Sequence, residues 1–404
     1  MNQAEEVAFD RETDRRGTHS AKWDTMDLQY GVPDMIHLGV ADMDFKTPEP
    51  VLDAVRRVLD RGVLGYTDID DGFFEAVRGW YEKQYGVSIQ KEWIVFCPRI
   101  NIAAGLCTEA FSKPGEKVMM HTPGYGPLKT AVTEAGREMT EIPLIWRGGR
   151  YEMDFEQMEE RVTPDTRMLI LCNPHNPTGR CWDLEELERL GAFCRQHGLV
   201  LFSDEIHGDL VRRGAEFHTA LKLSEQLFER LIVASSPAKT FNMPGMIVSF
   251  LVIPQPELRK RVEREIYRVG MHNPTAFAQE ALCAAYTECG GWHEAVLDYI
   301  DENEDYVRSF LERSFPEWTV MPREGTYLLW IDCRRDGLTE EMRERWFVQK
   351  AGVGVYAGGM FGAESRGFIR MNIAAGRGIL RRALERLAAA REGEEAFQKQ
   401  KNEG

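Results

Sequence analysis

A single lysine after an apolar run is the first residue in this sequence that is placed for chemistry. Lys239 follows residues 231–234, Leu-Ile-Val-Ala, which predict a buried strand. The end of such a strand lies at the mouth of an α/β sheet, where ligands bind. A lysine that loses its charge there by desolvation becomes a nucleophilic amine able to form a Schiff base. A solvated loop lysine is the commoner outcome, so the interpretation depends on what else reaches the same edge.

Two other apolar runs also end in polar side chains. The run that ends at Cys172 is followed by residues 173–179, whose two prolines and glycine predict a turn that offers Asn176. Another run delivers Asp204, with His207 three residues later. Taken singly, these residues suit a turn, a helix cap or a structural ion pair. A carboxylate, an amide, an imidazole and a lysine at one sheet edge together suit a cationic heteroaromatic cofactor that carries an aldehyde.

The order of these motifs resembles that of the fold-type I pyridoxal 5′-phosphate (PLP) enzymes related to aspartate aminotransferase. The motifs are Asn-Pro-x-Asn-Pro-Thr-Gly, Asp-Glu-Ile-His and Ser-x-x-Lys-x-Phe-Asn. More narrowly, the chain is similar to the MalY/PatB-type branch of cystathionine β-lyases, or C–S lyases, from about Gly17 to Arg391. The residues that carry this narrower resemblance are Lys22-Trp23-Asp24, Val40-Ala41-Asp42-Met43-Asp44-Phe45, Gly65-Tyr66-Thr67, Thr122-Pro123-Gly124-Tyr125 and His207, where many aminotransferases have tyrosine.

The resemblance implies the α/β fold of PLP-transferase fold type I, a mostly parallel central sheet flanked by helices, with a smaller α+β domain. The 404 residues are enough for two domains, and the alternation of strands and helices in the middle favours a parallel sheet. We expect an N-terminal segment (1–47) packing with the small domain, a large PLP-binding domain (48–285), a small domain (286–391) and a polar tail (392–404).

Several individual elements can also be predicted. Asp183 and Glu186 form a capping-box pattern at the start of a helix that stops at Gly198. Other expected helices span residues 50–61, 259–269, 275–289, 293–314, 340–351 and 377–391, and expected strands span 326–332 and 367–372. The glycine-rich run 357–362 is either a mobile active-site loop or a plain turn.

Composition excludes several classes of function. The formal charge of −15 argues against nucleic acid and anionic membranes as partners. No apolar run approaches the roughly 18 residues that span a bilayer, and residues 1–20 lack the apolar core of a signal peptide. The eight cysteines form no Cys-x-x-Cys pair and the nine histidines show no ligand spacing. We therefore expect a cytoplasmic protein without a metal site.

The resemblance assigns roles around the cofactor ring. Lys239 would carry PLP and act as the catalytic base, and Asp204 would stabilise the protonated ring nitrogen. Asn176 and His207 would bind the phenolic oxygen of the ring. Tyr125 would stack on the ring face.

The phosphate end matches the family less completely. Arg99 and Ile100 lie where the family places a helix N-terminus, and Ser236 matches its phosphate-binding hydroxyl. Ala238 stands in place of a second hydroxyl residue, and Ile247 in place of the phosphate-binding arginine of many aminotransferases. Either Arg99 supplies the missing positive charge or it points to solvent.

Other matched residues concern the substrate and a second subunit. Arg370 is the expected clamp for the α-carboxylate of an amino-acid substrate, because a bidentate guanidinium suits a carboxylate. Val40 and Ala41 would supply backbone near the same carboxylate. Tyr66 matches a residue that reaches the phosphate of the neighbouring subunit, which implies a homodimer with shared active sites.

The resemblance therefore implies a PLP-dependent C–S β-lyase that converts cystathionine or a related cysteine S-conjugate to a thiol, pyruvate and ammonia. Two alternatives stay open. The same residues could serve a PLP-dependent aminotransferase, and some relatives in this branch also bind a transcription regulator.

Overall fold

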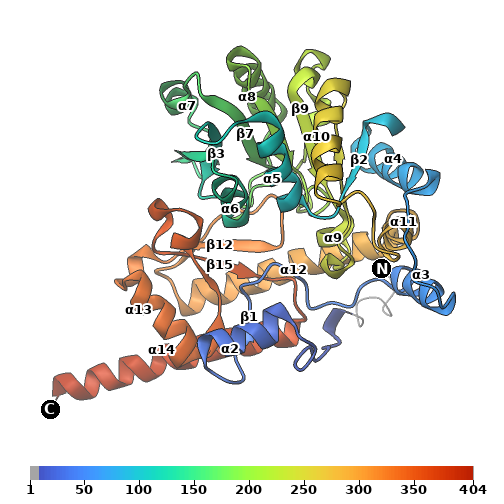
Figure 1. The fold of residues 1–404 in the computed structure, drawn as a ribbon. Helices are drawn as coiled ribbons and strands as arrows, with labels where there is room; N and C mark the ends of the chain where they lie inside the picture. Colours follow the sequence, from blue (N-terminus) through green and yellow to red (C-terminus); the bar gives the residue numbers. More distant parts are fainter. Residues whose placement is uncertain (1–8, 404) are drawn as a thin grey trace. The chain divides into compact units, whose positions relative to one another are not determined.

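The chain divides into two compact units. The computed structural model describes residues 9–403, with side chains described for residues 9–393 (Figure 1). The large unit consists of residues 47–294 with 324–326, and the small unit of the described residues before 47 with 295–323 and 327–403. Within the described residues, no helix combines the length and the apolar character needed to cross a bilayer.

The large unit is built on a seven-stranded sheet in the order β2-β10-β9-β8-β7-β3-β4. Only β10 runs antiparallel to its neighbours, β2 and β9, and the other neighbouring strands are parallel. The predicted α/β fold with a mostly parallel sheet is therefore confirmed. The strands are β2 (Ile94–Cys97), β3 (Lys117–Thr122), β4 (Glu138–Pro143), β7 (Thr166–Cys172), β8 (Val200–Asp204), β9 (Leu231–Ser235) and β10 (Ser249–Val252).

The strands form because their side chains are buried on both faces. Alternate residues such as Met168 and Ile170 belong to one core with helices α5 (Ile100–Phe111) and α10 (Pro256–Arg268), and the intervening Leu169 is equally buried. Near-continuous apolar runs of this kind are typical of parallel strands covered by helices on both sides. The pattern that predicted the strands is therefore the pattern that the packing requires.

Helix boundaries in the large unit follow local capping. Asp183 accepts a hydrogen bond from the amide of Glu186 (2.9 Å) and Glu186 accepts one from the amide of Asp183 (3.0 Å), which confirms the capping box of α8 (Leu184–His197). Gly198 ends α8 in the left-handed conformation (φ 67°), which glycine adopts without steric cost. The other helices are α3 (Glu49–Asp60), α4 (Asp71–Tyr85), α6 (Gly126–Glu134), α7 (Phe155–Arg161), α9 (Pro237–Thr240) and α11 (Ala278–Glu288), and β5 (Ile145–Arg147) pairs with β6 (Arg150–Glu152).

The small unit contains a four-stranded antiparallel sheet in the order β11-β12-β15-β14. Its strands are β11 (Thr319–Val320), β12 (Leu328–Asp332), β14 (Tyr356–Ala357) and β15 (Phe368–Asn372), and β1 (Ile36–His37) pairs separately with β13 (Val353–Gly354). Its helices are α2 (Met26–Tyr30), α13 (Glu340–Arg345) and α14 (Arg377–Glu403), and α12 (Gly290–Ser314) supplies its residues from 295 onward. Both strands and helices are present, as the predicted α+β architecture requires.

Three predicted boundaries in this unit were wrong. The strand expected from residue 326 begins at Leu328, because Thr326 is in the left-handed region (φ 67°), outside the extended conformation of a regular strand. The helix expected over 340–351 changes at Trp346 to a π-helical turn. The last helix continues to Glu403, well past its expected end at residue 391. Residues 392–403 of the predicted polar tail are therefore helical.

Two sequence motifs of the small unit meet in a buried cluster of charges. Lys22 Nζ donates to Asp44 Oδ2 (2.7 Å), and Trp23 Nε1 and Arg15 both donate to Asp44 Oδ1 (3.0 Å each). Arg15 also binds Asp42 (2.6 Å). Since the Lys22 side chain is fully buried, its charge depends on these carboxylates for stabilisation. The cluster therefore fixes the chain on either side of residue 43.

We expect Lys22→Met to lower the free energy of unfolding by about 3 kcal/mol, because it leaves a buried carboxylate without one of its cations. Urea denaturation followed by circular dichroism measures this change. Lys46→Met, at an exposed position of the same segment, is the matched control. Equal effects of the two substitutions would contradict the structural role of Lys22.

Candidate active site

Polar residues of the large unit gather at the carboxyl edge of its sheet. Strands β2, β3, β7, β8 and β9 share one direction, so their carboxyl ends lie along the same edge, where α/β sheets bind ligands. Nearly all of the predicted cofactor residues of this unit end or follow those five strands: Arg99 and Ile100, Tyr125, Asn176, Asp204 and His207, and Ser236 and Lys239.

Asp204 is the buried carboxylate of this edge. It is the last residue of β8, in register between Cys172 of β7 and Ala234 of β9, and only 4% of it is exposed. Its Oδ1 accepts a hydrogen bond from the amide of Ile206 (3.2 Å). Burial raises the pKa of Asp204 to about 6, and the charge of Lys239 opposes that rise. Asp204 is therefore ionised at neutral pH, and its burial makes this ionisation unfavourable in free energy. A bound cation would offset that free energy.

Glu205, the next residue, has a different environment. Its Oε1 accepts hydrogen bonds from the Ser203 hydroxyl (2.9 Å) and from the amide of Ala220 (2.8 Å). Burial raises the pKa of Glu205 to about 7, although hydrogen bonds from Thr219, Ala220 and Ser203 lower it. Glu205 thus joins β8 to the turn at Ala220, whereas Asp204 belongs to the sheet edge.

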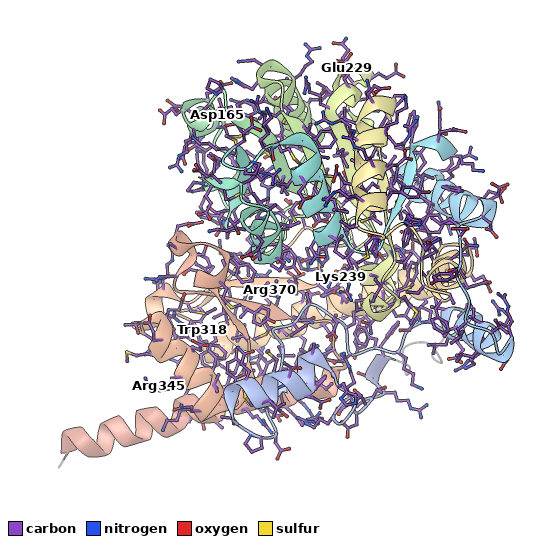
Figure 2. The ribbon with its side chains drawn as sticks, in the orientation of Figure 1. Asp165, Glu229, Lys239, Trp318, Arg345 and Arg370 are labelled. Atoms are coloured by element: carbon purple, nitrogen blue, oxygen red, sulfur yellow. The ribbon has the colours of Figure 1, made fainter. Side chains whose placement is uncertain are left out.

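Lys239 lies on the short helix α9 directly after β9. The residue is half-buried, and Figure 2 labels it on this helix. Ser236 caps α9, because its Oγ accepts a hydrogen bond from the amide of Ala238 (3.0 Å) and donates one to the carbonyl of Val248 (2.6 Å). For Ser236 to donate to a phosphate, its hydroxyl would have to leave Val248.

The sequence prediction missed Asp209, which anchors the lysine helix. Asp209 Oδ2 accepts a hydrogen bond from the hydroxyl of Thr240, the neighbour of Lys239 (2.7 Å). Its Oδ1 accepts from Trp80 Nε1 (2.9 Å) and from the Tyr85 hydroxyl (2.5 Å), both on α4. The available signal was its position, since Asp209 follows the Asp-Glu-Ile-His motif by two residues in an otherwise buried stretch.

The N-terminus of α5 offers backbone donors near the phosphate residues of the prediction. Arg99 is its N-cap residue, makes no side-chain capping bond and is exposed, whereas Ile100 is buried. The first amides of a helix lack intrahelical acceptors and form a natural anion site. Ile247 lies in the left-handed region (φ 55°), a strained conformation for a β-branched residue. Whether Arg99 replaces the missing arginine stays a prediction.

The remaining residues predicted around the ring differ in burial. Asn176 and His207 are buried, and Tyr125 is a half-buried residue that packs against the core beside α5. Tyr66, in contrast, is fully exposed (102%) and lies in a stretch of exposed residues of the large unit. Tyr66 is therefore not part of a buried site within a single chain.

Arg370 is one of the buried cations of the small unit. It lies on β15, is labelled in Figure 2, and donates to the carbonyl of Gly39 (2.7 Å). Asn372 on the same strand donates to the carbonyl of Val40 (2.8 Å), and the Tyr327 hydroxyl donates to that of Ala41 (3.0 Å). The structure thus brings together the three residues predicted for the substrate carboxylate.

The described residues hold no group of three or more histidine, cysteine, aspartate or glutamate side chains placed to bind a metal ion. The groups that the sheet edge offers are a buried carboxylate, a half-buried amine, a buried amide and imidazole, and the amides of a helix N-terminus.

The known proteins that this chain resembles match it over nearly its whole length. The model of the family "Aminotransferase class I and II" matches residues 33–387. Cystathionine β-lyase PatB of Bacillus subtilis is 35% identical over 383 residues, 95% of this chain and 99% of that protein. Cystalysin of Treponema denticola, solved with pyridoxal 5′-phosphate, has a TM-score of 0.92 at 33% identity and covers 95% of this chain and 98% of its own. The PLP-bound C–S lyase of Staphylococcus hominis has a TM-score of 0.88 at 32% identity, covering 95% and 97%.

The raised pKa of Glu205 predicts how stability depends on pH. Below pH 4 the Glu205 carboxyl is protonated in both the folded and the unfolded chain. As pH rises toward 7, the unfolded chain releases this proton and the folded chain keeps it. The free energy of unfolding therefore falls over this range. We expect Glu205→Gln to raise the free energy of unfolding by about 2 kcal/mol more at pH 8.5 than at pH 5. Urea titrations at both pH values measure this difference, with the exposed Glu229→Gln as control. Equal gains for Glu205→Gln at the two pH values would exclude the proposed cost of ionisation.

Proposed function

We propose that this chain, which belongs to the aminotransferase class I and II family, is a PLP-dependent carbon–sulfur β-lyase. It cleaves cystathionine or a related cysteine S-conjugate to a thiol, pyruvate and ammonia. The observation that carries the proposal is the buried Asp204, which interacts electrostatically with Lys239 at the sheet edge. The choice of lyase rests on the C–S lyases that the chain resembles over 95% of its length.

The sheet edge fits the ring of PLP. A buried carboxylate needs a partner of opposite charge, and the protonated ring nitrogen of the cofactor is such a partner. Asp204 would hold that nitrogen, and Lys239, half-buried on α9, would bond to the aldehyde carbon. Asn176 and His207 are buried amide and imidazole groups suited to the phenolic oxygen, and Tyr125 to the ring face.

The phosphate fits the N-terminus of α5. The amides that begin at Ile100 carry the positive end of the helix dipole, which favours an anion. Ser236 would add its hydroxyl after releasing Val248. Because Ala238 and Ile247 offer neither hydroxyl nor charge, most of the phosphate contacts would come from backbone amides.

The protein's own groups divide the work of elimination. PLP, when bound, supplies an electron sink for the charge that develops at the substrate α-carbon. Once the substrate amine has displaced it from the aldehyde carbon, Lys239 Nζ would take the α-proton as general base, and Asp204 would stabilise the positive charge of the ring. Asp209 holds α9 through Thr240, which limits the movement of the neighbouring Lys239. Arg370 would bind the α-carboxylate, with the backbone at Val40 and Ala41 beside it.

The working form that we propose is a homodimer with shared sites. Tyr66 lies in an exposed apolar stretch with Val63 (77% exposed) and Leu64. The stretch is fastened to a second segment that includes the exposed Asn273, since Asn273 Nδ2 donates to the carbonyl of Thr67 (3.0 Å). Apolar clusters of this kind mark association surfaces, and a second copy would cover them and bring Tyr66 to a neighbouring phosphate.

We also place the protein in the cytoplasm. Its eight cysteines are thiols, and six of them are buried. Burial raises the pKa of Cys97 to about 12 and that of Cys283 to about 11, so these thiols resist forming the reactive thiolate. Such a set suits a reducing compartment.

The β-lyase proposal predicts sustained turnover without a second substrate. The PLP-loaded protein should release pyruvate and thiol from L-cystathionine repeatedly, with no 2-oxo acid added. Lys239→Ala should lower the rate by about 10²- to 10⁴-fold, because it removes the general base. At most one equivalent of product, with the cofactor left in its pyridoxamine form, would identify an aminotransferase instead.

The shared-site proposal predicts that two defective variants complement each other. In a mixed dimer of Tyr66→Ala and Lys239→Ala chains, the site with an intact Lys239 receives an intact Tyr66 from its partner. Random mixing should therefore restore about one quarter of wild-type activity. Co-expression of the two variants, each with its own affinity tag, provides the mixture. Sedimentation gives the mass of the assembly relative to the 46.3 kDa chain. Activity no higher than that of the separate variants would show that Tyr66 does not act across subunits.

A further inference from the structure

We propose that Glu340 is a positioning residue for the substrate carboxylate, and that it acts through the turn η8 (Gly358–Phe361) on Arg370. The inference deepens the proposed function and rests on its assignment of Arg370 to the α-carboxylate. All of the residues involved belong to the small unit.

The guanidinium of Arg370 packs against two aromatic rings. Its guanidinium carbon lies 5.0 Å from the centre of the Tyr356 ring and 4.9 Å from that of Phe361. Tyr356 is the cross-strand partner of Arg370 on β14, so the sheet fixes it. Phe361 comes from η8 and packs edge-on against Trp330 on β12 (5.6 Å). One wall of the guanidinium site therefore depends on the position of a turn.

The turn has little room to move around its glycines. A β-carbon at Gly358 would lie 1.9 Å from the carbonyl oxygen of Ser365, and one at Gly359 would lie 2.2 Å from Glu340 Oε1. Gly362, which follows, has φ 154°, in the region that favours glycine. Close approach of backbone and side chains thus accounts for the glycine-rich run, and this conformation is more specific than that of a plain turn.

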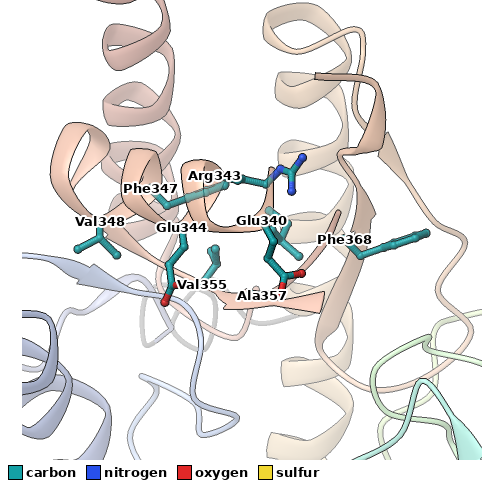
Figure 3. A pocket seen from close by; sticks show the side chains of 9 residues that line it. Glu340, Arg343, Glu344, Phe347, Val348, Val355, Ala357 and Phe368 are labelled. Carbon is teal, nitrogen blue, oxygen red and sulfur yellow. The ribbon is translucent and has the colours of Figure 1, made fainter. Parts of the chain in front are cut away.

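Glu340 fastens this turn from another element. It is the first residue of α13, and its Oε2 accepts a hydrogen bond from the amide of Gly359 (3.0 Å). Figure 3 shows the Glu340 side chain reaching from α13 toward the strand that carries Ala357. A hydrogen bond to an ionised carboxylate is stronger than a neutral one. Glu340 is therefore the side chain of α13 that holds the backbone two residues before Phe361.

Loss of this bond should act on substrate binding and spare the rest of the protein. Without Glu340 the turn gains freedom, Phe361 leaves its place over the guanidinium, and Arg370 is less well oriented toward a carboxylate. Glu340 itself touches no reacting group. Its removal should therefore weaken ligands that carry an α-carboxylate and leave amines without one unaffected.

The test compares two ligands of the PLP-loaded enzyme by the change in cofactor absorbance. Glu340→Ala should weaken L-alanine binding by about fivefold to tenfold and leave ethylamine binding unchanged, because only the former carries a carboxylate. Glu340→Gln, which keeps an acceptor oxygen, should bind L-alanine nearly as wild type does. The matched control is Glu341→Ala, at the exposed neighbouring position. Phe361→Leu, which removes the ring itself, should reproduce the loss specific to L-alanine.

Amide hydrogen exchange over residues 357–362 tests the contact independently of any ligand, and exchange should be faster in Glu340→Ala than in wild type. Unchanged exchange would overturn the fastening role of Glu340. Faster exchange with unaltered L-alanine affinity, or an equal loss for L-alanine and ethylamine, would overturn its role in positioning. Because amino-acid binding is common to lyases and aminotransferases, failure of the C–S lyase assay would leave this test intact.

Discussion

The hydrogen bonds of the Asp209 carboxylate hold the helix that carries Lys239 in its place in the large unit. It accepts hydrogen bonds from Trp80 and Tyr85 of α4 and from Thr240 of α9, and its backbone carbonyl is 2.7 Å from His293 Nε2 on α12. Helices α4 and α12, together with α9, which carries Lys239, are therefore fastened to the loop that follows β8. A short helix such as α9 has little stability of its own, so contacts of this kind decide where its side chains point.

The sequence predicts the sheet edge well because burial leaves a strong signal. Parallel strands covered on both faces must be apolar throughout, so the polar residues that end them stand out, as Asp204 does after β8. The capping box at Asp183 was equally predictable, since both of its hydrogen bonds are local. Residues whose role is set by the nearest few neighbours can be identified without a structure.

Roles that depend on distant partners could not be predicted. Nothing in the sequence links Ser236 with Val248, or Glu340 with Gly359, because these pairs are made by tertiary packing. The Lys22-Trp23 and Asp42–Asp44 motifs entered the prediction only through resemblance, and the structure supplies the physical reason, a buried cluster of charges. The end of α14 was missed for another reason, since a charged helix and a charged tail have similar composition.

The buried position of Asp204 also bears on the life of the protein in the cell. A carboxyl whose pKa is raised to about 6 is ionised at neutral pH at the expense of folding stability. A ligand that supplies the opposite charge binds only the folded chain and restores what ionisation costs. Newly made chains without that ligand would then open more often and be exposed to proteases for longer. The steady abundance of the protein would then follow the supply of vitamin B6, through degradation and without any change in synthesis.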